Sequence, residues 1–183
     1  MLTHSILKEL LDYNPETGVF TWRHRDSSWF MSHRSYASFC GKYVNKVAGN
    51  NKIAVNGKGY RNIMILNVGY LIHRVAWFYV FGEWPVNDID HIDGNGLNNK
   101  ILNLRDVTAL DNGRNKRLPS TNKSGVIGVC WHKRDEHWRA TIKVEQKTIS
   151  LGGFSSIDDA ISARKKASVK YGFHKNHGTV RPL

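Results

Sequence analysis

The sequence of 183 residues has few cysteines, no long apolar run and a shortage of acidic residues. Cys40 and Cys130 are its only cysteines and form no Cys-x-x-Cys pair, which argues against a zinc ribbon. We expect two buried free thiols, although a disulfide stays open as an alternative. No run approaches the roughly 20 apolar residues of a membrane span, and the N-terminal residues lack a signal-peptide pattern. These absences predict an intracellular protein with no membrane partner.

The shortage of acidic residues gives the chain a strong positive charge. Its 27 Lys and Arg residues against 15 Asp and Glu residues give a formal net charge of +12. Such an excess on one chain indicates a polyanionic partner, and nucleic acid is the expected one. Acidic lipid is the alternative, but no amphipathic helix with a basic face stands out.

One polar stretch, from Ile89 to Asn115, is unusually dense in groups able to bind a hard cation or move a proton. Asp90 and His91 are adjacent, Asn103 follows twelve residues later, and Asn112 comes nine residues after that. The pattern predicts a strand end, a loop, a second strand and a helix. Carboxylate and amide oxygens suit Mg²⁺, and an imidazole can accept a proton near neutral pH.

A turn rich in Asp, Asn and Gly is the alternative interpretation of this stretch, since such side chains commonly satisfy backbone groups in turns. We expect that simpler role for Asp93, Asn95, Asn98 and Asn99. The adjacent Asp90-His91 and the capped helix after Thr108 favour a functional site instead.

This spacing resembles the HNH endonucleases in their His-Asn-Asn variant, as found in phage and homing enzymes. The resemblance implies a ββα unit with one divalent ion, most often Mg²⁺ with Mn²⁺ possible. It implies His91 as general base, Asn103 as the residue that orients it, and Asp90 and Asn112 as metal ligands. The implied reaction is hydrolysis of double-stranded DNA by a nicking endonuclease, a monomer or dimer on DNA, in the cytoplasm of a bacterial or phage-infected host cell.

The residues before this stretch extend the resemblance from Tyr60 to Pro85. The apolar run from His73 to Phe81 predicts a buried helix that ends near Gly82, with its aromatic rings in the core. Arg74 is expected to contact phosphate or to support the site. His73 is either a second functional histidine or a core histidine at a helix start, and we favour the core.

The first 71 residues predict a mixed region. Leu2 to Leu11 has the spacing of a short amphipathic helix, and Val19–Trp22 has that of a strand. Arg23 to Gly41 mixes basic and aromatic residues without a period, so it is either a loop along DNA or a loop anchored on the core. Lys42 to Leu71 is expected to form β structure with turns at 57–59 and 67–69.

A linker is expected at residues 118–125, which are polar and rich in Gly, Pro and Ser. It separates a nuclease domain at 1–117, with its ββα core at about 86–117, from a second domain at 126–178. Arg114, Lys116 and Arg117 follow the predicted metal-binding helix and are expected to contact the DNA backbone.

The second domain alternates like an antiparallel sheet and then turns helical. Strands are expected at Val126 to Lys143, divided near Lys133 to Glu136, and at Thr148 to Gly152. Ser155 or Ser156 is expected to cap a helix that runs to about Tyr171, with Ala160, Ala163, Ala167 and Val169 on or near its packing side. The predicted fold class is therefore α+β throughout.

This region resembles the AP2 DNA-binding domain, a three-stranded sheet packed on one helix, through residues that include Gly125 to Val129, Trp138 to Ile142 and Leu151 to Phe154. In AP2 domains the sheet face opposite the helix binds DNA, which implies contacts from His132, Arg139, Thr141 and Lys143. The resulting hypothesis is an endonuclease targeted by a DNA-binding domain. The alternative is a sequence-specific DNA-binding regulator whose nuclease fold is inert.

Overall fold

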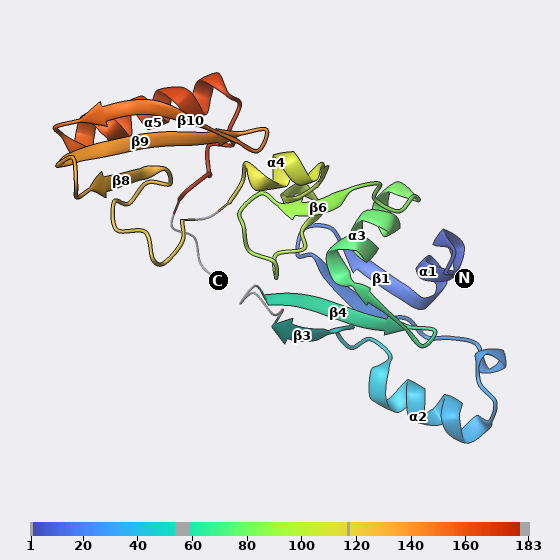
Figure 1. Cartoon of the computed structure of the whole chain (residues 1–183). Helices are drawn as coiled ribbons and strands as arrows, with labels where there is room; N and C mark the ends of the chain where they lie inside the picture. The colour runs from blue at the N-terminus through green and yellow to red at the C-terminus, as the bar shows by residue number, and fades with distance from the viewer. Residues whose placement is uncertain (1, 54–58, 117, 180–183) are drawn as a thin grey trace. The chain divides into compact units, whose positions relative to one another are not determined.

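The chain folds into two compact units that divide at Asp106–Val107 (Figure 1). The computed structural model describes residues 2–53, 59–116 and 118–179. Within these ranges, no helix has both the length and the apolar character needed to cross a membrane. Both units mix small antiparallel sheets with helices, in agreement with the predicted α+β class.

The first unit begins with the predicted helix and strand. Helix α1 covers His4–Leu10 and is capped by the Thr3 side chain, and strands β1 (Leu11–Asn14) and β2 (Val19–Trp22) pair as a hairpin. Leu11, expected at the end of the helix, instead has extended backbone and starts β1. The strand was missed because Leu10 and Leu11 are both fully buried, which hides the change of period.

The segment after β2 is helical, so the expectation of an irregular loop at Arg23 to Gly41 was wrong. A 3-10 turn, η1 (Ser27–Trp29), precedes helix α2 (His33–Tyr43), which Ser32 starts with a capping box. Tyr36, Phe39, Cys40 and Tyr43 do recur at the spacing of one helix face, but no residue of α2 is buried and basic and polar residues separate them, so this period was overlooked. Its rings pack locally instead, with the Arg25 guanidinium 4.3 Å from the centre of the Phe39 ring.

A three-stranded antiparallel sheet follows, made of β3 (Asn50–Ile53), β4 (Gly59–Ile65) and β5 (Val68–Leu71). Leu66 and Asn67, both with positive φ, turn β4 into β5. Of the other predicted turn, Gly57 and Lys58 lie outside the described residues.

Helix α3 (Ile72–Phe81) ends at Gly82, as predicted, where a φ of 78° allows the helix to stop. Phe78 is buried, and Trp77 and Tyr79 pack against the core. Phe81 is 54% exposed, so its expected core position was wrong. The rest of the core of this unit comes mainly from α1, the first hairpin, β4 and α3, with one residue each from β6 and β7: Leu2, Leu7, Leu10, Leu11, Phe20, Ala48, Ile63, Ile65, Ile72, Val75, Ala76, Ile89 and Leu104.

The polar stretch folds in the predicted order of strand, loop, strand and helix. Strand β6 (Asp88–His91) pairs with β7 (Leu104–Val107), and helix α4 (Ala109–Gly113) follows with Thr108 as its cap. The second strand starts at Leu104, because Ile101–Asn103 forms a 3-10 turn, η2. By its contacts α4 belongs to the second unit, where Gly178 N–H donates to Lys116 O at 2.7 Å.

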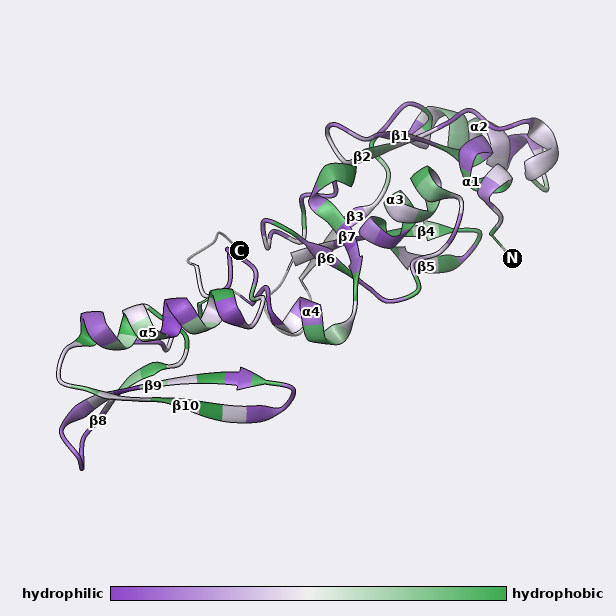
Figure 2. Ribbon diagram, turned by 90° about the horizontal axis from the view of Figure 1, so that it is seen from above, coloured by the Kyte–Doolittle hydropathy of each residue, from purple (hydrophilic) through white to green (hydrophobic). Residues whose placement is uncertain are grey.

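The second unit contains the expected three strands and one helix. Strands β8 (Val129–His132), β9 (His137–Val144) and β10 (Lys147–Phe154) pair antiparallel in the order β10-β9-β8, and Ser156 caps helix α5 (Ile157–Lys170). The small core is centred on Val129, Ala140 and Ala160. Figure 2 shows the corresponding apolar bands on α5 and β9 between polar ones.

Some side-chain placements in this unit differ from expectation. Val169 is 83% exposed, since it lies on the outer side of the last turn of α5. Cys130 and Cys40 are free thiols, but Cys130 is exposed because it alternates with the buried Val129 on β8. Val126 to Gly128 precedes β8 as a turn, because Gly125 and Gly128 both have positive φ.

We predict that Gly128→Ala destabilises the second unit by about 2–4 kcal/mol. Gly128 has a φ of 84°, and an added Cβ would lie 2.2 Å from the Thr141 carbonyl oxygen. The measurement is urea unfolding followed by tryptophan fluorescence.

Gly125→Ala is the matched control, because Gly125 has a φ of 76° and nothing within 4 Å of its added Cβ. Its free energy of unfolding should fall by only about 1 kcal/mol, the cost of a left-handed backbone conformation for a residue other than glycine. If both variants lose the same free energy of unfolding, the backbone near Thr141 can move away from the added Cβ at no energetic cost.

Candidate active site

Asp90 and His91 end strand β6 in a largely buried position. Their exposed fractions are 8% and 4%, and the strand alternates from exposed Asp88 to buried Ile89 before them. Polar groups buried to this degree are normally hydrogen-bonded, so their partners define the chemistry of the site.

The partner described for the His91 ring is Asn99. His91 Nε2 lies 3.3 Å from Asn99 Oδ1, and Asn99 is only 2% exposed. Asn99 Nδ2 donates to the Leu97 carbonyl oxygen, which orients the amide so that its oxygen faces the imidazole. Asn99 is therefore more than the turn former expected from the sequence. The loop after β6 folds back and so places Asn99 beside His91. The sequence has no periodic pattern that would predict this contact.

The backbone at Asn99 is fixed from the first hairpin. Tyr13 Oη donates to the Asn99 carbonyl oxygen at 2.7 Å. Gly18 packs so closely that a Cβ there would lie 2.4 Å from the Asn99 carbonyl carbon. The N-terminal hairpin thus holds the residue that contacts the imidazole.

Asn103 closes the loop that follows His91. Its Oδ1 accepts from the Asp93 N–H, its Nδ2 donates to Asp93 Oδ1 and to the Asn98 carbonyl oxygen, and its own carbonyl oxygen accepts from the Ile92 N–H. Asn103 was expected to orient the His91 ring. Its described bonds instead hold the loop after His91, and the described bond to the ring is that of Asn99.

Asp93 is a second anchor of the same loop. Its Oδ1 accepts from the Asn95 N–H at 2.8 Å, and its Oδ2 accepts from Asn98 Nδ2. Burial alone would raise the pKa of Asp93, but the bonds from Asn98, Asn95 and Asn103 outweigh it and lower the pKa below its usual value. Asp93, Asn95 and Asn98 have the turn-forming roles expected of them.

Asp90 is held by Arg105 of strand β7. Arg105 Nε and one terminal nitrogen both donate to Asp90 Oδ2, at 2.9 and 2.6 Å. This pair compensates the burial of the carboxylate, and sequence reasoning missed it. The sequence indicated this ion pair only indirectly, because Arg105 and Asp90 lie on two strands that were predicted to be neighbours.

The predicted metal ligands lie in different units, Asp90 on β6 of the first and Asn112 on α4 of the second. Among the described residues, no group of three or more His, Cys, Asp or Glu side chains is placed to hold a metal ion. One carboxylate and one amide oxygen fit a hard ion that keeps several of its waters, as Mg²⁺ does.

Two further rings surround His91. The His73 ring centre lies 5.1 Å from that of His91 in an edge-to-face arrangement, and the Tyr60 ring lies 6.0 Å from it. His73 is buried and its Nδ1 has no hydrogen-bond partner among the described residues. Burial, followed by the nearby charges of His91 and Arg74, lowers the pKa of His73 to about 3. His73 is therefore the expected core histidine, but it packs against the candidate base.

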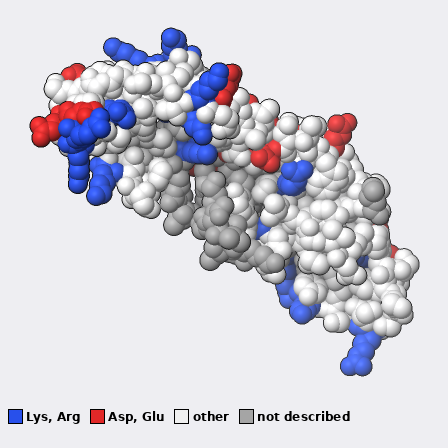
Figure 3. Space-filling view, in the orientation of Figure 1, with Lys and Arg blue, Asp and Glu red and all other residues white. Residues whose placement is uncertain are grey.

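The basic residues expected to contact DNA differ in their exposure and in the partners that they bond. Arg74 donates to the carbonyl oxygens of Asn87 and Pro85, so it supports the chain that enters β6. Arg114 pairs with Asp111 at 3.3 Å, Lys116 is exposed, and Arg117 lies outside the described residues. Figure 3 shows Lys and Arg side chains on the surface of the molecule.

On the sheet of the second unit, strand pairing brings most of the predicted contacts to one face. Arg139 pairs with Cys130 across β8 and β9, and Thr141 and Lys143 follow at alternate positions. Arg139 and Lys143 are exposed, and Thr141 is half-buried. His132 is on the same face, with its Nδ1 3.1 Å from Asp135 Oδ2.

We predict that His73 makes the first unit sensitive to acid. In the unfolded chain this imidazole becomes protonated near its ordinary pKa of about 6.5. In the folded chain its pKa is lowered to about 3. The unfolded state therefore binds more protons below pH 6.5, and stability falls by about 1.4 kcal/mol per pH unit from this group. His73→Leu should remove about 2 kcal/mol of the loss between pH 6.5 and pH 5.

Urea unfolding at both pH values measures this loss. His33→Leu is the control, because His33 is exposed on α2 and should leave the pH dependence unchanged. An identical pH dependence for wild type and His73→Leu would mean that His73 is protonated in the folded protein.

Comparison with known proteins agrees with this geometry over part of the chain. Residues 70–114 match the family model described as HNH endonuclease. The chain is also similar to Protein 3.8 of Escherichia phage T7, with 46% identity over 76 residues that make up 41% of this chain and 63% of that protein. The chain thus spans less than two thirds of this relative, and no solved structure matches it significantly. The match to the HNH endonuclease family model thus covers the segment from α3 to α4, which holds the candidate site.

Proposed function

We propose that the protein is a metal-dependent DNA endonuclease that nicks double-stranded DNA, with His91 as its general base. The observation that carries the proposal is the imidazole of His91 at the end of β6, held by Asn99 beside Asp90, inside the segment that matches the HNH endonucleases. Phosphodiester hydrolysis needs a base for the attacking water and positive charge for the oxygens that become negative.

The contact with Asn99 would orient His91 for the role of base. The amide nitrogen of Asn99 donates to the Leu97 carbonyl oxygen, so the amide oxygen faces His91 Nε2 at 3.3 Å. This contact would hold the imidazole in a fixed orientation toward the attacking water. Asn103 keeps the loop after His91 closed, which holds the base in place.

A divalent ion, most suitably Mg²⁺ with Mn²⁺ as a substitute, would be held by Asp90 and Asn112. It would supply positive charge for the non-bridging and leaving oxygens of the phosphate. Arg105 meanwhile neutralises Asp90 Oδ2, so the buried carboxylate is stabilised whether or not an ion is bound.

The second unit would bind the DNA that the first unit cuts. Its AP2-like arrangement of three strands and one helix leaves the sheet face with Arg139, Thr141 and Lys143 uncovered by α5. The net charge of the whole chain favours this role, since cations on an open face neutralise phosphates. His132, Arg114, Lys116 and Arg117 are the further contacts in this proposal.

One observation favours the alternative of a DNA-binding regulator with an inert nuclease fold. The two-pronged bond from Arg105 already neutralises Asp90, so an ion has to compete with a strong partner. Such a regulator would bind DNA without Mg²⁺-dependent cutting.

We predict that His91→Ala lowers the rate of plasmid nicking by about 10² to 10⁴-fold, because a positioned general base contributes that much. The assay follows conversion of supercoiled to open-circular plasmid with and without Mg²⁺. DNA affinity should stay close to that of wild type, since the imidazole acts on water and not on the DNA.

His4→Ala is the control, because His4 on α1 bonds the Tyr79 carbonyl oxygen away from this loop. It should nick at the wild-type rate. Wild-type protein that binds plasmid but never nicks it in Mg²⁺ or Mn²⁺ would favour the inert regulator, and nicking by His91→Ala at the wild-type rate would exclude His91 as the base.

We predict that Arg139→Ala weakens DNA binding and lowers the slope of log affinity against log salt by about one, as expected for one lost phosphate contact. Fluorescence anisotropy with a labelled duplex at several salt concentrations measures the slope. Lys166→Ala removes the same charge from an exposed position on α5 and should leave the slope unchanged. Equal effects of the two variants would mean that the sheet face is not the DNA-binding face.

A further inference from the structure

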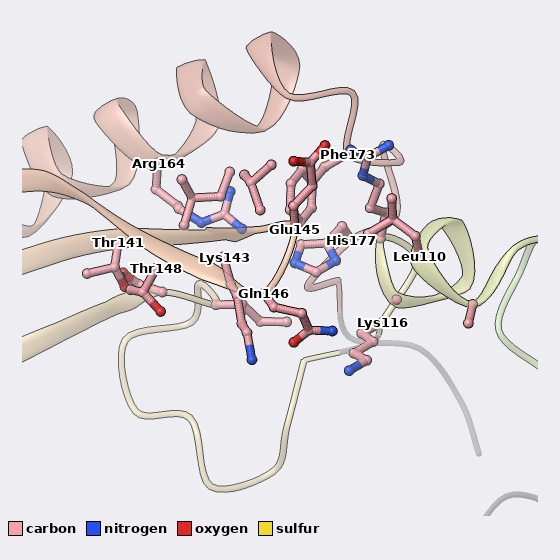
Figure 4. Close-up of a pocket in the computed structure, with 17 residues that line it drawn as sticks. Leu110, Lys116, Thr141, Lys143, Glu145, Gln146, Thr148, Arg164, Phe173 and His177 are labelled. Atoms are coloured by element: carbon pink, nitrogen blue, oxygen red, sulfur yellow. The ribbon is translucent and has the colours of Figure 1, made fainter.

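The second unit contains a cavity that shares Arg114, Lys116, Thr141 and Lys143 with the proposed DNA contacts but is also lined by residues that those contacts do not use, Arg164 and Phe173 among them. Its volume is about 490 Å³, within the range of cavities that hold small ligands. Its lining comes from four places in this unit: α4, the segment before β8, the β9–β10 hairpin, and α5 with the residues that follow it. Figure 4 shows these side chains around one space.

The cavity is strongly cationic. Arg114, Lys116, Lys143 and Arg164 line it, and Glu145 is the acidic residue of the lining. Four cations around one opening repel one another, so a ligand with negative charge is the natural partner. In Figure 4 Lys143 and Gln146 extend away from α5, whereas Arg164 extends from α5 toward the sheet.

Among these four cations, Arg164 is buried and has no carboxylate partner among the described residues. It is 3% exposed, and no carboxylate of the described residues lies within ion-pair distance of it. One terminal nitrogen donates to Ser168 Oγ, but its Nε has no hydrogen-bond partner among the described residues. A buried charge without a counter-charge is costly, and an anion in the cavity would supply one.

The remaining lining is suited to an organic group attached to that anion. Ile127, Ile142 and Phe173 offer apolar surface, and Thr141 and Thr148 offer hydroxyl groups. Two guanidinium groups lie near the Phe173 ring, with Arg164 5.2 Å and Arg114 5.8 Å from its centre. A bare inorganic anion would leave this apolar surface unused.

We propose that this cavity binds a nucleoside phosphate, with the phosphate near Arg164 and the cationic side chains and the base and sugar against the apolar surface. The ligand is either a free nucleotide or a nucleotide of a DNA strand, since both present the same chemical groups. The site requires neither the metal nor His91, so its test is separate from that of cleavage.

The test is isothermal titration of the full-length protein with dAMP in metal-free buffer. Deoxyadenosine and inorganic phosphate, each with half of the ligand's groups, are titrated in parallel and should bind at least about tenfold more weakly. Arg164→Gln should weaken dAMP binding by about tenfold or more, because it removes the buried charge. Thermal unfolding checks that this variant folds.

A second pair of variants avoids the buried position. Gln146→Glu and Lys147→Gln each lower the net charge by one at neighbouring exposed residues, but only Gln146 lines the cavity. Gln146→Glu should weaken dAMP binding severalfold, and Lys147→Gln should leave it almost unchanged.

Absence of saturable dAMP binding, or equal affinities of Gln146→Glu and Lys147→Gln, would overturn the proposal. Binding of phosphate or deoxyadenosine as tight as that of dAMP would overturn it too. Competition by a single-stranded oligonucleotide identifies a DNA strand as the source of the nucleotide, and dAMP binding unaffected by the oligonucleotide identifies a free nucleotide. Each of these two results supports the cavity as a nucleotide site.

Discussion

The hydrogen bonds between Asn103 and the loop that follows His91 are the interaction on which the candidate site depends. Asn103 bonds the backbone at Ile92, Asp93 and Asn98, and so joins the end of β6 to the start of β7. Without this closure the loop could not bring Asn99 back to the imidazole. The Asn103 side chain takes part in three of these bonds, two of them to backbone groups, which explains why a stretch so rich in Asn and Asp forms a single ordered loop.

Burial sets the electrostatics around this loop. The buried Asp90 carboxylate accepts two hydrogen bonds from Arg105, whereas the Nδ1 of buried His73 has no partner among the described residues and burial lowers the pKa of that ring. The site therefore combines an ion pair with a ring that resists protonation next to the candidate base. In the second unit Arg164 is a third case, a buried cation that pairs with no carboxylate of the described part of the chain, and a cavity lies next to it.

The sequence predicted those parts of the fold that have a local signal. Thr108, Ser156 and Gly82 marked helix ends through capping chemistry, and strand alternation placed Arg139, Thr141 and Lys143 on one face. Helix α2 was missed although Tyr36, Phe39, Cys40 and Tyr43 have helical spacing, because basic and polar residues separate them and no residue of the helix is buried. Asn99 and Arg105 were missed because their roles arise from contacts between segments distant along the chain, and no local pattern reports such contacts. Asp90, His91, Asn103 and Asn112 were the reverse case, since their spacing and the cap at Thr108 together predicted the strand, loop, strand and helix of this segment.

The support of Asn99 by the first hairpin has a consequence for how this kind of site can be moved between proteins. Tyr13 and Gly18 fix the backbone of the residue that faces the imidazole, yet both precede the family-matched segment by more than fifty residues. A graft of residues 70–114 onto another scaffold would carry His91 and Asn99 but lack the Tyr13 and Gly18 contacts that fix the Asn99 backbone. The portable module is larger than the motif, and its N-terminal boundary lies before β1.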